Sequence, residues 1–221
     1  MNKIEVISID GPSASGKSTV ARGIARKLNM IYVDSGALYR AITWHVLKNK
    51  INFSDINKIS ELIYSTNWNF YISDGAIVFS INEYQPTSEL RTKVVRESVA
   101  AIASIKIVRK FIIKNLQSYI KFGSLVIEGR DIGSVVFPDT PYKFYLDAKP
   151  EERAKRRFNE LEKYGEKGHS KDIFDSLKKR DQIDSTRDID PLTIPIGAKI
   201  IDTTILSITE VIDEVIKEIK Q

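Results

Sequence analysis

A glycine-rich loop between an apolar segment and a helical pattern places the strongest constraint on the fold of this chain. Residues 11–18 read Gly-Pro-Ser-Ala-Ser-Gly-Lys-Ser and follow the apolar run Ile4–Ile9. After the loop, Val20, Ile24 and Leu28 recur at helical spacing. This is the G-x-x-x-x-G-K-[ST] phosphate loop in the strand–loop–helix setting that it requires. The pattern predicts a nucleoside triphosphate site at the start of the helix, where backbone N–H groups and the helix dipole favour anions.

The loop motif also predicts what its polar side chains do. Lys17 is expected to reach the β- and γ-phosphates of ATP, and the Ser18 hydroxyl to ligate Mg²⁺. The residues that we expect to bind ATP on this side are Gly11, Pro12, Ser13, Ala14, Ser15, Gly16, Lys17, Ser18 and Thr19.

Composition excludes several classes of protein. With 221 residues, of which 42% are hydrophobic, the chain has enough material for one domain with a substantial core. It has no cysteine, which excludes disulfides and thiolate metal sites. The apolar start carries Glu5 and Asp10, unlike a signal peptide. No segment reaches the roughly 20 apolar residues that span a bilayer. We therefore expect a cytoplasmic, monomeric protein that is independent of membranes.

The positive net charge does not by itself indicate a nucleic-acid partner. The charge is +5, but the basic residues are spread among acidic ones along the chain. Because polymer binding favours a clustered basic surface, we expect small phosphorylated ligands and no nucleic-acid polymer.

Short apolar runs alternate with helical patterns, which is typical of a parallel sheet flanked by helices. The predicted strands are Ile4–Ile9, Ile31–Val33, Leu125–Glu128, Lys143–Asp147 and Ala198–Asp202. The predicted helices include one after Ser35-Gly36, a long amphipathic one within Glu97–Phe122, one that begins at Pro150, and a C-terminal one that Ser207 and Glu210 cap. The fold class is therefore α/β, of the phosphate-loop NTPase type.

One region departs from this alternation. Trp68–Ile72 and Ile77–Ile81 are alternating apolar segments on either side of Asp74-Gly75, which is a strong signal for an antiparallel hairpin. We interpret about residues 65–95 as an inserted β subdomain within one domain that spans 1–221. Residues of about 150–187 are interpreted as a lid.

Further segments separate the possible phosphate-loop enzymes. The chain has neither the Asn-Lys-x-Asp motif of GTPases nor a Leu-Ser-Gly-Gly-Gln signature, which leaves a small kinase. Four segments decide between the possible enzymes: Asp34–Arg40 after the second predicted strand, Glu128–Gly133 after the third, Val135–Asp139 shortly after that, and Arg180–Arg187 after a helix near the end. Ligands of an open α/β sheet lie beyond the carboxyl ends of its strands, so arginines there would clamp a phosphate.

On these segments and the phosphate loop, the chain resembles the bacterial cytidylate kinase family of nucleoside-monophosphate kinases. The motifs are D-S-G-A-[LI]-Y-R, G-R-D-[IM]-G-x-V-V-F-P and R-D-x-x-D-x-x-R, and the resemblance covers essentially the whole chain. It implies transfer of a phosphoryl group from ATP to CMP or dCMP, with Mg²⁺ and a small β insertion near the monophosphate.

The resemblance also implies residue roles. CMP would be bound by Ser35, Arg40, Arg109, Arg130, Asp131, Arg180, Asp184 and Arg187. The implied catalytic residues are Lys17, Arg130, Arg180 and Arg187. In this scheme Asp184 contacts the sugar hydroxyl, and Arg109 contacts the cytosine ring from the long helix. Arg156 and Arg157, with Arg153, are lid candidates on one helical face, the first two assigned to ATP.

Two positions depart from the family pattern. Ala100 stands where a serine commonly reads the cytosine, and Glu128 stands where aspartate is frequent. Two alternatives therefore stay open: a relaxed pyrimidine-monophosphate kinase that also uses UMP, and a non-catalytic module that binds ATP.

Overall fold

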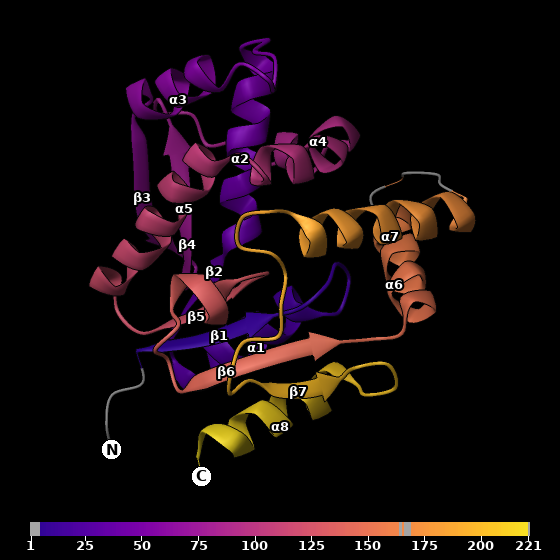
Figure 1. The fold of residues 1–221 in the computed structure, drawn as a ribbon. Helices are drawn as coiled ribbons and strands as arrows, with labels where there is room; N and C mark the ends of the chain where they lie inside the picture. The colour runs from indigo at the N-terminus through magenta and orange to yellow at the C-terminus, as the bar shows by residue number, and fades with distance from the viewer. Residues whose placement is uncertain (1–4, 164, 166–168, 221) are drawn as a thin grey trace.

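A seven-stranded sheet forms the centre of the computed structural model, which describes residues 5–163, 165 and 169–220 (Figure 1). The strand order is β3-β4-β2-β5-β1-β6-β7. The five strands of the central parallel part are β1 (Val6–Asp10), β2 (Ile31–Asp34), β5 (Leu125–Gly129), β6 (Tyr142–Asp147) and β7 (Lys199–Asp202). They confirm the five predicted strands to within two residues. Ile4, the first residue of the first predicted strand, lies outside the described residues.

Eight α-helices accompany the sheet in the described part of the chain. They are α1 (Lys17–Leu28), α2 (Ser35–Lys48), α3 (Ile56–Ser65), α4 (Lys93–Ala103), α5 (Lys106–Ser118), α6 (Pro150–Lys163), α7 (Ser170–Thr186) and α8 (Ile208–Ile219). The Ser207–Glu210 capping box at the start of α8 is present as predicted, a feature that contributes about 1 kcal/mol to a helix.

Helices cover both faces of the sheet because alternate residues of each strand point to opposite faces. On β1, Ile7 and Ile9 pack with α1 and α8, whereas Val6 packs with α2, α3 and α5 on the other face. On β5, Val126 lies in the same apolar cluster as Ile7 and Ile9, and Ile127 lies in the same cluster as Val6. The parallel strands are thus buried on both faces, which explains their continuous apolar runs.

The predicted hairpin is confirmed, with β3 (Trp68–Ser73) antiparallel to β4 (Ala76–Ile81). Asp74 and Gly75 both have positive φ angles, of 49° and 70°, as a tight two-residue hairpin turn requires. The hairpin extends the main sheet, because β4 pairs with β2 at Tyr32 and Ala76. That residues 65–95 behave as a subdomain of their own stays a prediction.

The expectation of a single long helix within Glu97–Phe122 is wrong. Helix α4 ends at Ala103, α5 begins at Lys106, and the 3₁₀ turn Tyr119–Phe122 follows α5. At the break, the Ser104 hydroxyl donates to the carbonyl of Ala100 (3.0 Å), and Ile105 has an extended conformation. The apolar periodicity survives this break, so it did not reveal the change of direction.

The carboxyl ends of β2 and β5 lead into the predicted segments Asp34–Arg40 and Glu128–Gly133, and that of β1 leads into the phosphate loop. Val135–Asp139 lies between β5 and β6, and Arg180–Arg187 lies at the end of α7. In Figure 1, β6 points toward α6 and α7, which stand beside that end of the sheet. Residues 164 and 166–168, which fall inside the predicted lid, lie outside the described residues.

Candidate active site

The phosphate loop connects β1 to α1 with a backbone that only particular residues adopt readily. Gly11 and Gly16 have φ angles of +145° and +93°, and Ala14 has one of +61°. A Cβ atom at Gly11 would lie 2.0 Å from the carbonyl oxygen of Leu146, so a side chain there would displace β6. The sequence therefore needs glycine at this position for the loop to lie against the sheet.

Lys17 is buried at the start of α1, with its ammonium group turned into the loop. Its Nζ donates to the carbonyl of Pro12 (2.6 Å) and to the Ser15 hydroxyl (3.4 Å). Burial and the positive charge of Arg130 lower the pKa of Lys17 to about 7, although Glu128 acts in the opposite direction. A phosphate placed here would relieve this unfavourable environment and keep the lysine protonated.

Ser18 and Glu128 form a pair of oxygen ligands between the phosphate loop and β5. The Ser18 hydroxyl donates to Oε1 of Glu128 (2.6 Å), which also accepts from the Tyr32 hydroxyl (3.4 Å). Burial and the neighbouring Asp34 raise the pKa of Glu128. Mg²⁺ prefers such hard oxygen ligands and usually takes only one or two from the protein, the rest being phosphate and water. The two side chains therefore fit a magnesium ion that arrives with ATP.

Asp10 ties the end of β1 to the segment after β5. Its carboxylate is fully buried and accepts from the backbone N–H groups of Ile132 (2.8 Å) and Gly133 (2.7 Å). Burial raises the pKa of Asp10 to about 7, against the effect of these two hydrogen bonds and of Lys17. The π-helical turn Ile132–Val136 is thus held next to the phosphate loop.

Ser35 and Arg40 lie at the start of α2, directly after β2. Asp34 caps this helix by accepting from the N–H of Ala37 (2.8 Å), and its other oxygen accepts from Arg40 (2.8 Å). Burial alone would raise the pKa of Asp34, but Arg40 and the helix N–H outweigh it and lower the pKa. Ser35 donates to the carbonyl of Glu128 (2.7 Å) and so lies beside the end of β5, whereas Arg40 is held by Asp34 at the end of β2.

A network of ion pairs joins the arginines that follow β5 and α7. Arg130 donates through Nε to Asp184 (3.0 Å), and Arg187 lies 3.7 Å from the same carboxylate. Burial acts to raise the pKa of Asp184, but the surrounding arginines lower it. Asp184 is thus an ionised carboxylate between two of the residues predicted to bind CMP.

Arg180 is the cation in this group whose charge is least compensated. Its Nε atom is buried and has no hydrogen-bond partner among the described residues. Burial and the nearby charge of Arg130 lower the pKa of Arg180 to about 10. A buried donor without a partner costs free energy. An anion bound by Arg180 and Arg130 would supply that partner and would stabilise both guanidinium groups.

Arg109 and Asp131 form the most deeply buried ion pair of the site. The side chain of Arg109, on α5, is 1% exposed and donates through Nη2 to Asp131, while Arg187 lies 3.8 Å from the other oxygen of Asp131. The expectation that Arg109 extends from the same helix as Ala100 is wrong, because Ala100 belongs to α4. Ala100 is buried, and the nearby Ser104 hydroxyl is bonded to its carbonyl.

The three lid arginines on α6 have different surroundings. Arg153 is buried and contacts the phosphate loop, donating to the Ser13 carbonyl (3.2 Å) and pairing with Asp181 of α7. Arg156 donates to the hydroxyl (3.0 Å) and carbonyl (2.5 Å) of Thr203, a residue that itself bonds the carbonyl of Ser15. Of the two assigned to ATP, Arg156 therefore lies against the loop.

Arg157 has a different partner. Its guanidinium pairs with Glu160 of the same helix (2.6 Å). The helical spacing predicts one shared face for the three lid arginines but gives no sign of these separate partners.

Sequence reasoning missed several residues that hold the site together. Asp181 accepts from the N–H of Ser13 (3.1 Å) as well as from Arg153, so it fixes the phosphate loop to the lid helices. Asp10 had one available signal, its place directly before the loop. Asp190 had none for its bond to Arg109, because the two residues are 81 positions apart in sequence.

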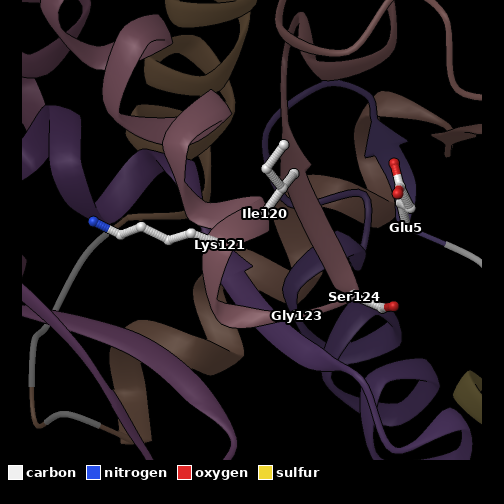
Figure 2. Close-up of a pocket in the computed structure, with 5 residues that line it drawn as sticks. All are labelled: Glu5, Ile120, Lys121, Gly123 and Ser124. Atoms are coloured by element: carbon white, nitrogen blue, oxygen red, sulfur yellow. The ribbon is translucent and has the colours of Figure 1, made fainter.

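A separate pocket lies at the opposite end of the sheet. Figure 2 shows its lining by Glu5, Ile120, Lys121, Gly123 and Ser124, near the starts of β1 and β5, with a volume of about 310 Å³. In Figure 2 the Lys121 side chain extends away from Glu5, so their charges do not converge. The groups suited to phosphate chemistry are instead those at the carboxyl ends of the strands.

Comparison with solved structures supports the fold. The structure is similar to a crystal structure of an uncharacterized protein from Eubacterium ventriosum, with a TM-score of 0.56 and 14% identity, over 98% of this chain and 99% of that one. In the described part of the chain, no helix combines the length and the apolar character needed to cross a membrane.

Comparison with curated sequences identifies the family. Residues 7–221 match the sequence model of the family described as cytidylate kinase. The chain is 43% identical over 218 residues to a cytidylate kinase of Fusobacterium nucleatum, covering 98% of this chain and 97% of that one. It is 40% identical over 215 residues to a cytidylate kinase of Caldanaerobacter subterraneus, covering 97% and 94%. The chain belongs to the cytidylate kinase family.

Proposed function

We propose that this protein transfers the γ-phosphoryl group of ATP to CMP or dCMP, giving ADP and CDP or dCDP. One observation supports the proposal above the others. The Ser18 hydroxyl of the phosphate loop donates to Glu128 (2.6 Å), two residues before the acceptor-side Arg130, so the donor loop adjoins the segment of the acceptor arginines. In agreement with this, the charges of Arg130 and Arg180 lower the pKa of Lys17. Donor and acceptor phosphates would therefore meet in one strongly positive site.

On the donor side, the loop backbone of residues 11–19 binds the ATP phosphates and Lys17 neutralises their charge. Arg156 lies within reach of this loop, since a Cβ atom on Gly16 would be 3.8 Å from its Nη1. Arg153 and Asp181 hold the loop from the lid side. Ser18 and Glu128 would hold Mg²⁺, which when bound screens the phosphate charges.

On the acceptor side, Arg40, Arg130, Arg180 and Arg187 are the candidates for binding the CMP phosphate. Guanidinium groups suit this task because their planar donors match phosphate oxygens bidentately. Asp184, ionised and next to Arg130, is the candidate acceptor for a sugar hydroxyl. Arg109, Asp131 and Ser35 complete the acceptor side around it.

The chemistry needs little more than this arrangement. The attacking group is an oxygen of the CMP phosphate, which is already anionic, so no strong general base is required. The protein's contribution is to align the two phosphates and to neutralise the charge that develops between them. Each tenfold gain in rate corresponds to about 1.4 kcal/mol of transition-state stabilisation.

The enzyme is further proposed to act as a monomer in the cytoplasm, where both substrates are available. Light scattering after size-exclusion chromatography tests the first part, because one chain has a mass of 25.1 kDa.

Analysis of products tests the reaction itself. Purified protein with Mg·ATP and CMP should form CDP and ADP in equal amounts. Without CMP, ADP formation should fall to a small fraction of that rate. Hydrolysis of ATP that is independent of CMP, with no CDP formed, would contradict the proposal.

A further inference from the structure

Asp190, in the segment after α7, contacts two arginines of the acceptor side at once. Its carboxylate oxygen Oδ2 accepts from Nε of Arg109 (2.7 Å), and its backbone carbonyl accepts from Nε of Arg187 (2.7 Å). Its φ angle is +47°, in the left-handed region that aspartate tolerates better than most residues. This conformation directs carboxylate and carbonyl toward different arginines.

Arg109 is held on several sides. Nη2 donates to Asp131, Nη1 donates to the carbonyl of Ala103 (3.3 Å), and the guanidinium carbon lies 5.7 Å from the centre of the Tyr39 ring. A guanidinium has five N–H groups, so these bonds and that to Asp190 leave one N–H on each of Nη1 and Nη2. The Nε bond is the third hydrogen bond that fixes the direction of those two donors.

The Asp190 carboxylate is the partner that completes this arrangement. The Arg109 side chain is 1% exposed, so removal of the Nε partner would leave a buried donor unsatisfied. Asp131 does not replace Asp190, because it already accepts from Nη2 and also faces Arg187 at 3.8 Å. Arg109 and Arg187 repel one another, and burial together with the charge of Arg109 lowers the pKa of Arg187.

We infer that Asp190 is a positioning residue for the acceptor nucleotide: it fixes the guanidinium of Arg109 and joins α5 to the segment that follows the lid helix α7. The inference rests on the proposed function, because it takes Arg109 to be part of the CMP site. Both side chains that Asp190 contacts are arginines assigned to the acceptor side, so its influence is expected on acceptor binding.

The test uses variants that keep the backbone conformation. Asp190→Asn removes the charge with almost no change in shape, and Asp190→Gly removes the side chain but tolerates a positive φ angle. The backbone carbonyl that binds Arg187 is retained in both. Asp188→Asn, at an exposed carboxylate two residues earlier, is the matched control.

The expected result is a rise of about tenfold in the KM for CMP with Asp190→Gly, which loses the hydrogen bond between charged groups. Asp190→Asn should cause a smaller rise, because its amide oxygen still accepts from Nε but carries no charge. The KM for ATP should stay within twofold, and Asp188→Asn should behave as the wild type. In an Arg109→Ala background, Asp190→Asn should cause no further change in the KM for CMP, because its target is gone.

Other outcomes would overturn the inference. If Asp190→Asn and Asp190→Gly raise both KM values equally, or lower the melting temperature with no selective effect on CMP, the residue is merely structural. Full additivity with Arg109→Ala would show that Asp190 does not act through Arg109. A wild-type protein that forms no CDP would contradict the proposed function itself, whereas an unchanged KM in the variants contradicts only the role of Asp190.

Discussion

The Ser18 hydroxyl donates a 2.6 Å hydrogen bond to Oε1 of Glu128, which joins the phosphate loop to the end of β5. The bond brings together two oxygen-bearing side chains from positions 110 residues apart in sequence. It also shows why glutamate is accommodated at position 128: the longer side chain ends within hydrogen-bond distance of both Ser18 and Tyr32.

The first prediction concerns this pair and magnesium. Ser18→Ala should raise the Mg²⁺ concentration that gives half-maximal activity by severalfold, because a ligand to the ion is lost. Titration of activity with Mg²⁺ at saturating ATP and CMP measures this. The exposed Ser54→Ala is the control, and an unchanged Mg²⁺ dependence in Ser18→Ala would remove the hydroxyl from the metal site.

Lys17→Ala should lower kcat by at least about 100-fold, equivalent to about 2.7 kcal/mol of transition-state stabilisation. The melting temperature should stay the same or rise, because the substitution removes a charge whose pKa burial lowers to about 7. Steady-state kinetics and thermal unfolding check both parts. Lys27→Ala, at an exposed position paired with Asp213, should leave kcat nearly unchanged. A mild effect on kcat at position 17 would contradict the role given to that lysine.

Asp184→Ala should impair both stability and acceptor use. It leaves Arg130 without its 3.0 Å partner, and breaking a buried pair in this way costs about 3 kcal/mol. The KM values for CMP and dCMP should rise while that for ATP changes little. Denaturant unfolding and kinetics with both acceptors measure these effects, with exposed Asp175→Ala on the same helix as the control. Unaltered acceptor kinetics would exclude Asp184 from the site.

Asp10 predicts a particular dependence of stability on pH. Burial raises its pKa from the ordinary 3.8 to about 7, so between these values the native state binds more protons than the unfolded state. Ionisation of Asp10 therefore destabilises the native state as the pH rises through this range. Asp10→Asn cannot ionise, so its free energy of unfolding should improve relative to the wild type as the pH rises from 3.8 to about 7. Urea unfolding at several pH values tests this, and a constant difference would refute it.

Much of the fold is readable from the sequence because local patterns and long-range packing agree. The runs that became β1 and β5 are apolar on both faces, and Asp74-Gly75 specifies its turn without help from the rest of the chain. The segment that became α4 and α5 is different. Its apolar spacing continues through Ser104 and Ile105, so only tertiary packing decides that the helix ends there.

The site is readable in part for a related reason. The phosphate loop and the arginine segments are local motifs, and they meet because the carboxyl ends of parallel strands share one edge. Their partners are not local: Arg109 and Asp190 are 81 residues apart, and Arg153 reaches Ser13 across 140. No pattern along the chain encodes such pairings, so the structure was needed to find what Asp10, Asp181 and Asp190 contact.

A comparison of acceptors decides whether this protein is a cytidylate kinase in its own right. The measurement is kcat/KM for ADP formation from Mg·ATP with CMP, dCMP, UMP and AMP as separate acceptors. We predict efficient turnover of CMP and dCMP and values at least about tenfold lower for UMP and AMP, despite alanine at position 100. Equal values for CMP and UMP would contradict selective cytidylate recognition, and absence of turnover with all four would contradict the assigned reaction.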